Sequence, residues 1–148
     1  MKTLQYSIQI GATPERVWEC LWEPGHYRQW TGVFCEGSYY ETERFSEGSR
    51  IRLLTPGGEG MYSVLERVDE PRFLAFRHLG WISGFRDVPP AENEEPWQEA
   101  RETYSLATDG EATVLVVQVD TLDEYIGHME AKFPPALEAV KRMAESKL

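Results

Sequence analysis

The 148-residue sequence predicts an α+β domain in which a curved antiparallel sheet wraps around a long C-terminal helix. Strand-like segments joined by short turns fill the middle of the chain, which is typical of an antiparallel meander. Residues 123–146 instead carry apolar side chains at spacings of three and four, the pattern of an amphipathic helix. This helix has to bury its apolar stripe, and the concave face of a bent sheet is the available place.

Local signals near the N-terminus predict a strand followed by two short helices. Residues 4–10 alternate apolar and polar side chains, as a strand with one buried face does. Thr13 before Pro14 is a helix start, because a hydroxyl caps the first turn and proline fits its first position. A second short helix is expected at residues 26–30. Because these helices precede the other strands, the first strand must pair with a later one.

The remaining strands are predicted from alternating patterns and from the turns between them. Asp69-Glu70-Pro71 and Asp109-Gly110 are strong turn signals. With the first strand, these segments predict a sheet of about six to seven strands. The expected segments are residues 39–45, 50–54, 61–68, 72–79, 102–107 and 113–121.

Two features depart from this regular order. Residues 81–98 form an acidic insertion interrupted by prolines, longer than a normal hairpin loop, and loops of that length are often lids or mobile segments. Pro134-Pro135 lies inside the final helical pattern, where proline removes a backbone donor, so a kink or break is expected there. No linker divides the chain, and we interpret residues 1–148 as a single domain with one insertion.

Charge and composition exclude some classes of partner. The formal net charge of −10 repels phosphate backbones and anionic membrane surfaces, so a nucleic acid or a membrane is not expected as partner. No apolar run approaches the ~20 residues of a membrane span. Cys20 and Cys35 form no motif, and the N-terminus shows no signal region, so a cytoplasmic location with reduced thiols is expected.

Several segments, taken in their order along the chain, resemble one known superfamily. They are residues 8–18, a strand entering a proline-started helix with Val-Trp; residues 24–30, a short helix ending in tryptophan; residues 60–68 with 71–76, a central hairpin; and residues 112–115, a last strand. This order is similar to the helix-grip (SRPBCC) superfamily, which includes START, Bet v 1-like and polyketide cyclase domains. More narrowly, it resembles the branch related to the C-terminal domain of the Hsp90 ATPase activator.

The resemblance implies a cavity between the sheet and the C-terminal helix. Members of the superfamily bind lipids, hormones, polyketides or other hydrophobic molecules, a few are enzymes, and some serve as cochaperone modules. A small hydrophobic molecule is therefore the first expected partner, with a chaperone partner and a homodimer as further possibilities. Fold alone does not choose among these roles.

Apolar residues on the inward faces of the predicted elements are the candidates for lining the cavity. The alternative is that they fill a solid core, because aromatic side chains give large burial in either case. The candidates are Trp30, Phe34, Leu53, Leu65, Phe76, His78, Tyr104, Val117, Met129 and Phe133.

The polar residues that could act in catalysis or binding do not indicate any particular reaction. Arg52, Arg67, Arg77 and Arg101 fall in strand patterns; we expect them to face solvent and pair with Glu66, Glu99 or Glu102, the alternative being an anion-binding arginine inside the cavity. His78 is expected to be a hydrogen-bonded core histidine rather than an acid or base. No metal spacing, nucleophile elbow or phosphate loop is present, so no metal, cofactor or catalytic residue is predicted.

Three functions remain open at this point. The first is a binding module for a small hydrophobic or amphipathic ligand, and it is the one we favour. The second is a stress-related or cochaperone-like interaction module, suggested by the exposed acidic insertion with Trp81 and Trp97. The third is a cyclase- or hydrolase-type enzyme, which would need His78, Tyr104 or Arg77 inside the cavity.

Overall fold

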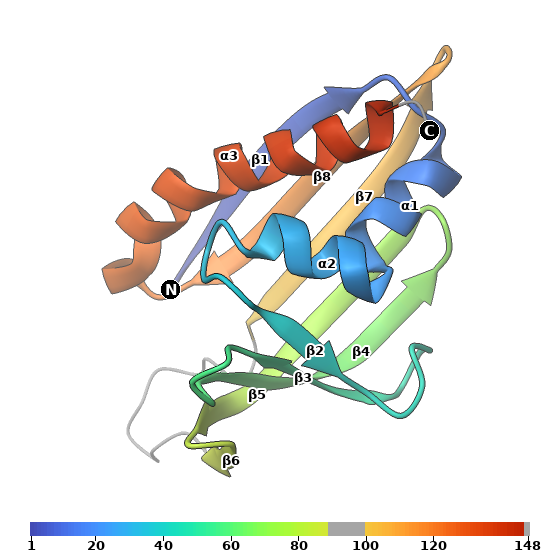
Figure 1. The fold of residues 1–148 in the computed structure, drawn as a ribbon. Helices are drawn as coiled ribbons and strands as arrows, with labels where there is room; N and C mark the ends of the chain where they lie inside the picture. Colours follow the sequence, from blue (N-terminus) through green and yellow to red (C-terminus); the bar gives the residue numbers. More distant parts are fainter. Residues whose placement is uncertain (89–99, 147–148) are drawn as a thin grey trace.

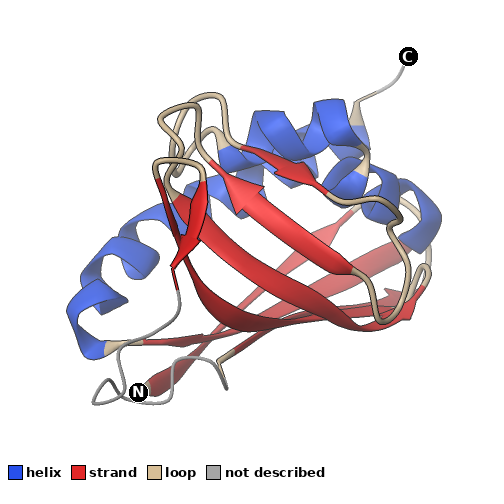
Figure 2. Ribbon diagram, turned by 90° about the horizontal axis from the view of Figure 1, so that it is seen from below, coloured by secondary structure: helices blue, strands red, loops and turns tan. Residues whose placement is uncertain are grey.

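The computed structural model describes residues 1–88 and 100–146 and confirms the predicted α+β architecture (Figure 1). The helices lie over one face of a bent antiparallel sheet (Figure 2). In chain order the elements are β1 (Lys2–Ile10), α1 (Pro14–Trp22), α2 (Pro24–Thr31), β2 (Tyr39–Glu41), β3 (Arg50–Leu54), β4 (Gly60–Asp69), β5 (Phe73–Ser83), β6 (Arg86–Val88), β7 (Arg101–Asp109), β8 (Ala112–Thr121), the 3-10 turn Asp123–Tyr125 and α3 (Ile126–Glu145).

The sheet has the strand order β1-β8-β7-β5-β4-β3-β2, and β6 pairs with β5 outside this path. The first strand pairs antiparallel with the last, from Lys2 opposite Thr121 to Ile10 opposite Thr113. The prediction that β1 pairs late in the chain is therefore confirmed. This pairing places the first and last strands of the chain side by side beneath the C-terminal helix (Figure 1).

Helix α3 lies across the sheet and packs against α1, α2 and β1. Its buried residues are Phe133, Ala136, Leu137, Val140 and Ala144, which repeat at helical spacing. The helix therefore buries the stripe that the sequence predicts.

The sequence predicts a kink or a break at Pro134-Pro135, and a break is wrong, since α3 is helical from Ile126 to Glu145 with both prolines inside it. Both prolines are exposed, as are Glu130 and Ala131 one turn earlier. The carbonyls that lose their N–H partners lie on this exposed side of the helix, where water can satisfy them. The cost of the two prolines is thereby reduced.

The two N-terminal helices begin at side-chain caps. The Thr13 hydroxyl accepts a hydrogen bond from the Arg16 backbone N–H at 3.2 Å, as expected for an N-cap. The carboxylate of Glu23 accepts from the backbone N–H groups of Gly25 and His26. Helix α2 therefore starts at Pro24, two residues before the predicted position, because Glu23 caps it and proline fits its first turn.

The strand boundaries differ from the prediction by more than two residues in two places. Strand β2 is shorter, ending at Glu41, and β5 is longer, reaching Ser83. A tight turn at Gly84 and Phe85, both with positive φ, joins β5 to β6. The start of the expected insertion is therefore a β-hairpin, which raises the sheet to eight strands, while residues 89–99 lie outside the described part of the chain.

Candidate functional site

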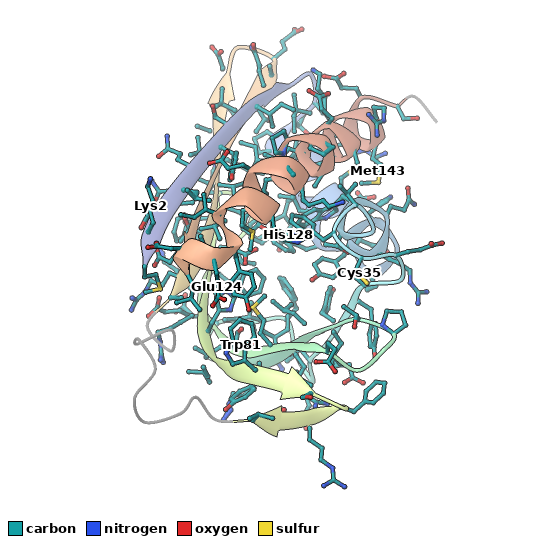
Figure 3. The ribbon with its side chains drawn as sticks, turned by 90° about the vertical axis from the view of Figure 1, so that its left-hand side faces the viewer. Lys2, Cys35, Trp81, Glu124, His128 and Met143 are labelled. Carbon is teal, nitrogen blue, oxygen red and sulfur yellow. The ribbon has the colours of Figure 1, made fainter. Side chains whose placement is uncertain are left out.

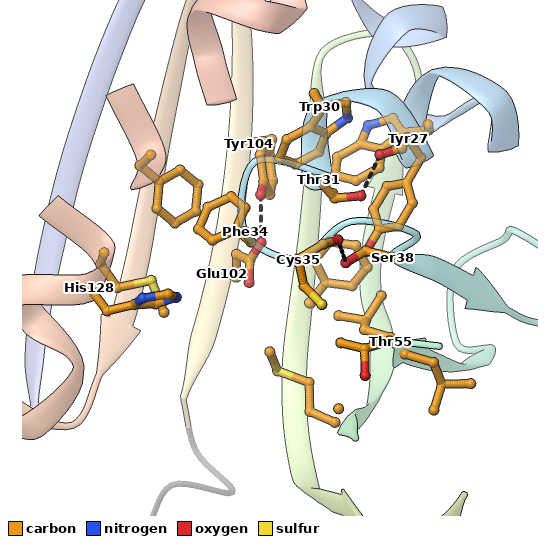
Figure 4. Close-up of a pocket in the computed structure, with 18 residues that line it drawn as sticks. Tyr27, Trp30, Thr31, Phe34, Cys35, Ser38, Thr55, Glu102, Tyr104 and His128 are labelled. Atoms are coloured by element: carbon orange, nitrogen blue, oxygen red, sulfur yellow. Dashed lines mark hydrogen bonds between the residues drawn. The ribbon is translucent and has the colours of Figure 1, made fainter. Parts of the chain in front are cut away.

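A pocket of about 290 Å³ lies between the sheet and the helices (Figure 4). The end of α1, helix α2 with the turn after it, the β3–β4 hairpin, the first halves of β5 and β7, and the first half of α3 form its walls. The lining residues are Trp22, Tyr27, Trp30, Thr31, Phe34, Cys35, Ser38, Leu53, Leu54, Thr55, Gly60, Met61, Phe76, Glu102, Tyr104, His128, Met129 and Phe133.

Seven of the ten candidate residues from the sequence line this pocket. They are Trp30, Phe34, Leu53, Phe76, Tyr104, Met129 and Phe133. Leu65, His78 and Val117 are buried but do not line it. Leu65 and Val117 belong to the packed apolar core, as the solid-core alternative expects. That the seven lining residues hold a ligand stays a prediction.

The inner wall of the pocket is aromatic. The centre of the Trp22 ring lies 4.8 Å from that of Tyr104 and 5.5 Å from that of Phe76, and both contacts are edge-to-face. The Trp30 indole N–H donates to the Leu21 carbonyl at 2.9 Å, which fixes that ring. The Trp22 indole N–H is also buried but has no hydrogen-bond partner among the described residues. Buried donors normally have partners, so this unpartnered indole N–H is an exception within the aromatic wall.

The mouth of the pocket is more polar and more exposed. Cys35, after α2, and His128, on α3, are both exposed and line the pocket from different elements (Figure 3). Phe34, Met61 and Met129 beside them are half-buried. Flexible methionine side chains at a mouth adapt to ligands of different shape.

A chain of hydrogen-bonding groups runs from the floor of the pocket into the sheet. The Tyr104 hydroxyl donates to Oε2 of Glu102 at 2.5 Å. The other carboxylate oxygen, Oε1, lies 3.4 Å from Nε2 of His78. Nδ1 of the same ring lies 2.7 Å from the Ser63 hydroxyl oxygen. The Ser63 hydroxyl can donate to this nitrogen or accept from it, depending on the tautomer of the ring.

Sheet register explains this chain of contacts. Glu102 and Tyr104 are two residues apart on β7 and so share one face of the strand. Phe76 on β5 pairs directly with Glu102, and Ser63 on β4 pairs with His78. A register irregularity next to Ser63 accompanies the latter pairing. The prediction that His78 is a hydrogen-bonded core residue is confirmed.

Solved structures resemble this chain over nearly its whole length. Neither family sequence models nor curated protein sequences match it. The Aha1 dimer of Colwellia psychrerythraea has a TM-score of 0.70 at 18% identity, with 98% of this chain and 97% of that chain covered. Protein MLL2253 of Mesorhizobium loti has a TM-score of 0.74 at 15% identity, with 99% and 100% covered. DynU16, from the dynemicin biosynthetic locus, has a TM-score of 0.73 at 17% identity; 99% of this chain spans 48% of DynU16.

The chain has the helix-grip fold. The resemblance noted from the sequence motifs is thus confirmed at the level of fold. In this helix-grip chain the pocket lies where the superfamily resemblance implies a cavity, between the sheet and the C-terminal helix.

Glu102 is the main residue of the helix-grip pocket that sequence reasoning missed. The sequence suggested it as a surface partner for an arginine, whereas it lines the pocket and contacts Tyr104. The available signal was strand alternation, because an inward Tyr104 requires an inward residue two positions earlier. Charged residues are seldom buried, which argued against that assignment.

The four strand arginines do not line the pocket, so the anion-binding alternative is wrong. Arg77 and Arg101 both pair with Glu66, at 3.4 and 2.7 Å. Arg52 contacts Glu41 and Asp87 at 3.3 and 3.2 Å. The guanidinium of the exposed Arg67 lies 5.1 Å from the centre of the Phe73 ring.

Other site chemistry is limited in the described part of the chain. Residues 1–88 and 100–146 hold no group of three or more histidine, cysteine or acidic side chains placed to bind a metal ion. None of the described helices has the length and apolar character needed to cross a membrane. Cys20 is buried and Cys35 exposed, and both thiols are free.

Burial raises the pKa of four tyrosines in this fold: Tyr6, Tyr27, Tyr40 and Tyr104. Desolvation is the main cause, and it raises the pKa of Tyr6 to about 12 with a further contribution from the charge of Glu130. Desolvation, followed by the charge of Glu102, also raises the pKa of Tyr27 and Tyr104 well above the ordinary tyrosine value. The neutral phenols are therefore favoured by the folded state.

The elevated tyrosine pKa values predict a loss of stability in alkali. The unfolded chain releases its phenolic protons near pH ~10, while the folded chain keeps them, so the unfolded state becomes relatively more favourable as pH rises. The free energy of unfolding should be constant in this respect below about pH 10 and fall between about pH 10 and 12. Urea titrations across this range measure it, and Tyr27→Phe or Tyr104→Phe should make the fall shallower. A free energy of unfolding that stays level to pH ~12 would contradict the assignment.

Proposed function

We propose that this helix-grip chain binds a small apolar or amphipathic molecule in the pocket between the sheet, α2 and α3. The observation that supports the proposal is an opening of about 290 Å³ with an aromatic wall and few polar groups. Ligand pockets span roughly 300–1,000 Å³ and are mostly apolar with a few placed polar groups. The volume of this pocket lies just below the lower end of that range. A compact ring-containing molecule therefore suits it better than a long-chain lipid.

Filling the pocket with a side chain tests the proposal. Leu53 is half-buried on the pocket wall, and Leu53→Trp would place an indole in the space a ligand would use. N-phenylnaphthylamine, a neutral dye that fluoresces in apolar surroundings, is the probe. The wild-type chain should give a saturable rise in fluorescence, and Leu53→Trp should weaken dye binding by about tenfold or more.

Val64→Trp is the matched control, since Val64 is a half-buried residue of the neighbouring strand that does not line the pocket. This variant should bind the dye as the wild type does. The proposal fails if the wild-type chain shows saturable binding neither of the dye nor of the naphthalene ligands described below. It also fails if both tryptophan variants bind the dye equally well.

An enzymatic role in the same pocket has less support. Of the three residues that the sequence offered for catalysis, Tyr104 lines the pocket, His78 lies behind Glu102, and Arg77 pairs with Glu66. The Ser63 hydroxyl contacts His78 but is fully buried and does not line the pocket. A Ser63 nucleophile would therefore have no access to a bound substrate.

Self-association is a second proposal, favoured by one observation. The Colwellia protein of the same fold is described as an Aha1 dimer. Light scattering on the purified chain distinguishes a dimer from a monomer directly. A chaperone partner is likewise a proposal, whose support is the likeness to that Aha1 structure.

A further inference from the structure

We propose that the pocket selects ligands that carry an ammonium group or another cationic hydrogen-bond donor on a small apolar body. This inference rests on the proposed function and specifies the chemical class of its ligand. It starts from Glu102, whose carboxylate lines an otherwise mainly apolar pocket. The described residues that line the pocket include neither lysine nor arginine.

The carboxylate of Glu102 is held in place while keeping capacity for a ligand. Tyr104 donates to Oε2 at 2.5 Å, and the His78 ring approaches Oε1 at 3.4 Å. Each oxygen thus has one neighbouring donor group among the residues that the structure describes. An ionised carboxylate has about four lone-pair sites over its two oxygens, so further donors can bind. The buried Ser63 hydroxyl contacts the other nitrogen of the His78 ring and so holds the imidazole in place behind Glu102.

Aromatic rings surround the space beside this carboxylate. Phe76 pairs with Glu102 across β5 and β7, and Tyr104 follows two residues later on the same strand face. The rings of Trp22 and Trp30 lie 4.8 and 6.2 Å from the Tyr104 ring. Aromatic faces attract cations, and they do so more strongly where water is excluded. Carboxylate and rings therefore favour the same kind of ligand.

The overall charge of the chain acts in the same direction. At a net charge of −10 the protein attracts cations and repels anions over distances of about a Debye length. An anionic ligand, such as a fatty acid, would meet both this field and the Glu102 carboxylate. A neutral ligand would gain the apolar contacts but not the charge-assisted hydrogen bond.

Three ligands with one shared ring system test this inference. Naphthylmethylamine is protonated at neutral pH, ethylnaphthalene is its neutral isostere, and naphthoate is anionic. Displacement of N-phenylnaphthylamine measures the dissociation constant of each. The amine should bind the wild-type chain about tenfold or more tighter than ethylnaphthalene, since a hydrogen bond to a charged group contributes about 1.5–3 kcal/mol. Naphthoate should bind more weakly than ethylnaphthalene.

The variant Glu102→Gln should remove the preference for the amine, so that the ratio of the two dissociation constants falls toward one. Glu138→Gln is the control, because Glu138 is an exposed carboxylate on α3 and its loss changes the net charge equally. That variant should keep the wild-type ratio. Because the comparison of three ligands uses the wild-type chain, it remains decisive even if Glu102→Gln does not fold.

The outcomes separate this inference from the function on which it rests. If ethylnaphthalene binds as tightly as the amine, or naphthoate binds best, selection for cations is overturned while ligand binding in the pocket stands. If Glu138→Gln lowers the ratio as much as Glu102→Gln does, the preference arises from net charge, and the role of Glu102 is overturned. If none of the three ligands and not even the dye binds, both proposals fall.

Discussion

Replacing Trp22 by alanine is expected to lower the free energy of unfolding by about 3–5 kcal/mol, the usual cost of removing a buried tryptophan. Trp22 is the centre of the aromatic cluster. Its ring meets those of Tyr104, Phe76 and Phe45 within 6.0 Å. The side chain is only 4% exposed, so the cavity left by the substitution cannot collapse easily.

Urea denaturation followed by circular dichroism measures the effect of Trp22→Ala. Tyr125→Ala is the control, since Tyr125 is an aromatic residue exposed at the start of α3, and its loss should change stability by about 0.5 kcal/mol or less. A Trp22→Ala variant as stable as Tyr125→Ala would show that the cluster is not packed as described. Dye binding should also weaken in Trp22→Ala, because Trp22 forms part of the pocket wall.

The substitution Leu137→Asp is expected to destabilise the chain by more than about 4 kcal/mol, a large part of the 5–15 kcal/mol typical of a whole domain. Leu137 is 2% exposed and lies in the middle of the stripe by which α3 packs on the sheet. Aspartate there loses the apolar contacts and buries a carboxylate without a partner.

Its neighbour on the helix provides the control for Leu137→Asp. Glu138 is exposed, so Glu138→Ala should change the free energy of unfolding by about 0.5 kcal/mol or less. Thermal unfolding of the two variants side by side measures the difference. If Leu137→Asp unfolds at the wild-type temperature, α3 does not pack on the sheet through this face.

The order and type of the elements could be predicted from the sequence because each has a local cause. The Thr13 cap and Pro14 set the start of α1, and the apolar spacing around Leu137 sets the buried face of α3. The pairing of β1 with β8 followed from the order of elements alone. These signals act within a few residues or follow from chain connectivity.

The features that were predicted wrongly, the end of β5 and the helix through Pro134-Pro135, depend on causes beyond the local sequence pattern. The turn after Ser83 places Phe85 at positive φ, a conformation that phenylalanine rarely adopts and that its sequence does not announce. The prolines of α3 are tolerated because they face outward, and that depends on how the whole helix lies. A pattern read residue by residue does not contain this information.

The same holds for the pocket: the strand pattern predicts which residues face inward, but side-chain packing decides which of them line the pocket. Alternation identifies Leu65, Phe76 and Val117 as inward, but it does not say which of them meets open space and which meets packed side chains. All three belong to the core cluster, but only Phe76 also lines the pocket. Glu102 was missed because its charge argued for an exposed position, although strand alternation correctly predicted an inward one.

The most direct test of the account is to observe ligand entry at the tryptophan side chains. The indole N–H signals of the five tryptophans can be followed by heteronuclear NMR and assigned with Trp→Phe variants. Trp22 and Trp30 line the pocket, while Trp18 and Trp81 do not. On titration with N-phenylnaphthylamine, the Trp22 and Trp30 signals should shift and saturate together, with smaller changes at Trp18 and Trp81. Saturable shifts confined to Trp81, or no shift at Trp22 and Trp30 when the dye is bound, would contradict a ligand pocket between the sheet and the helices.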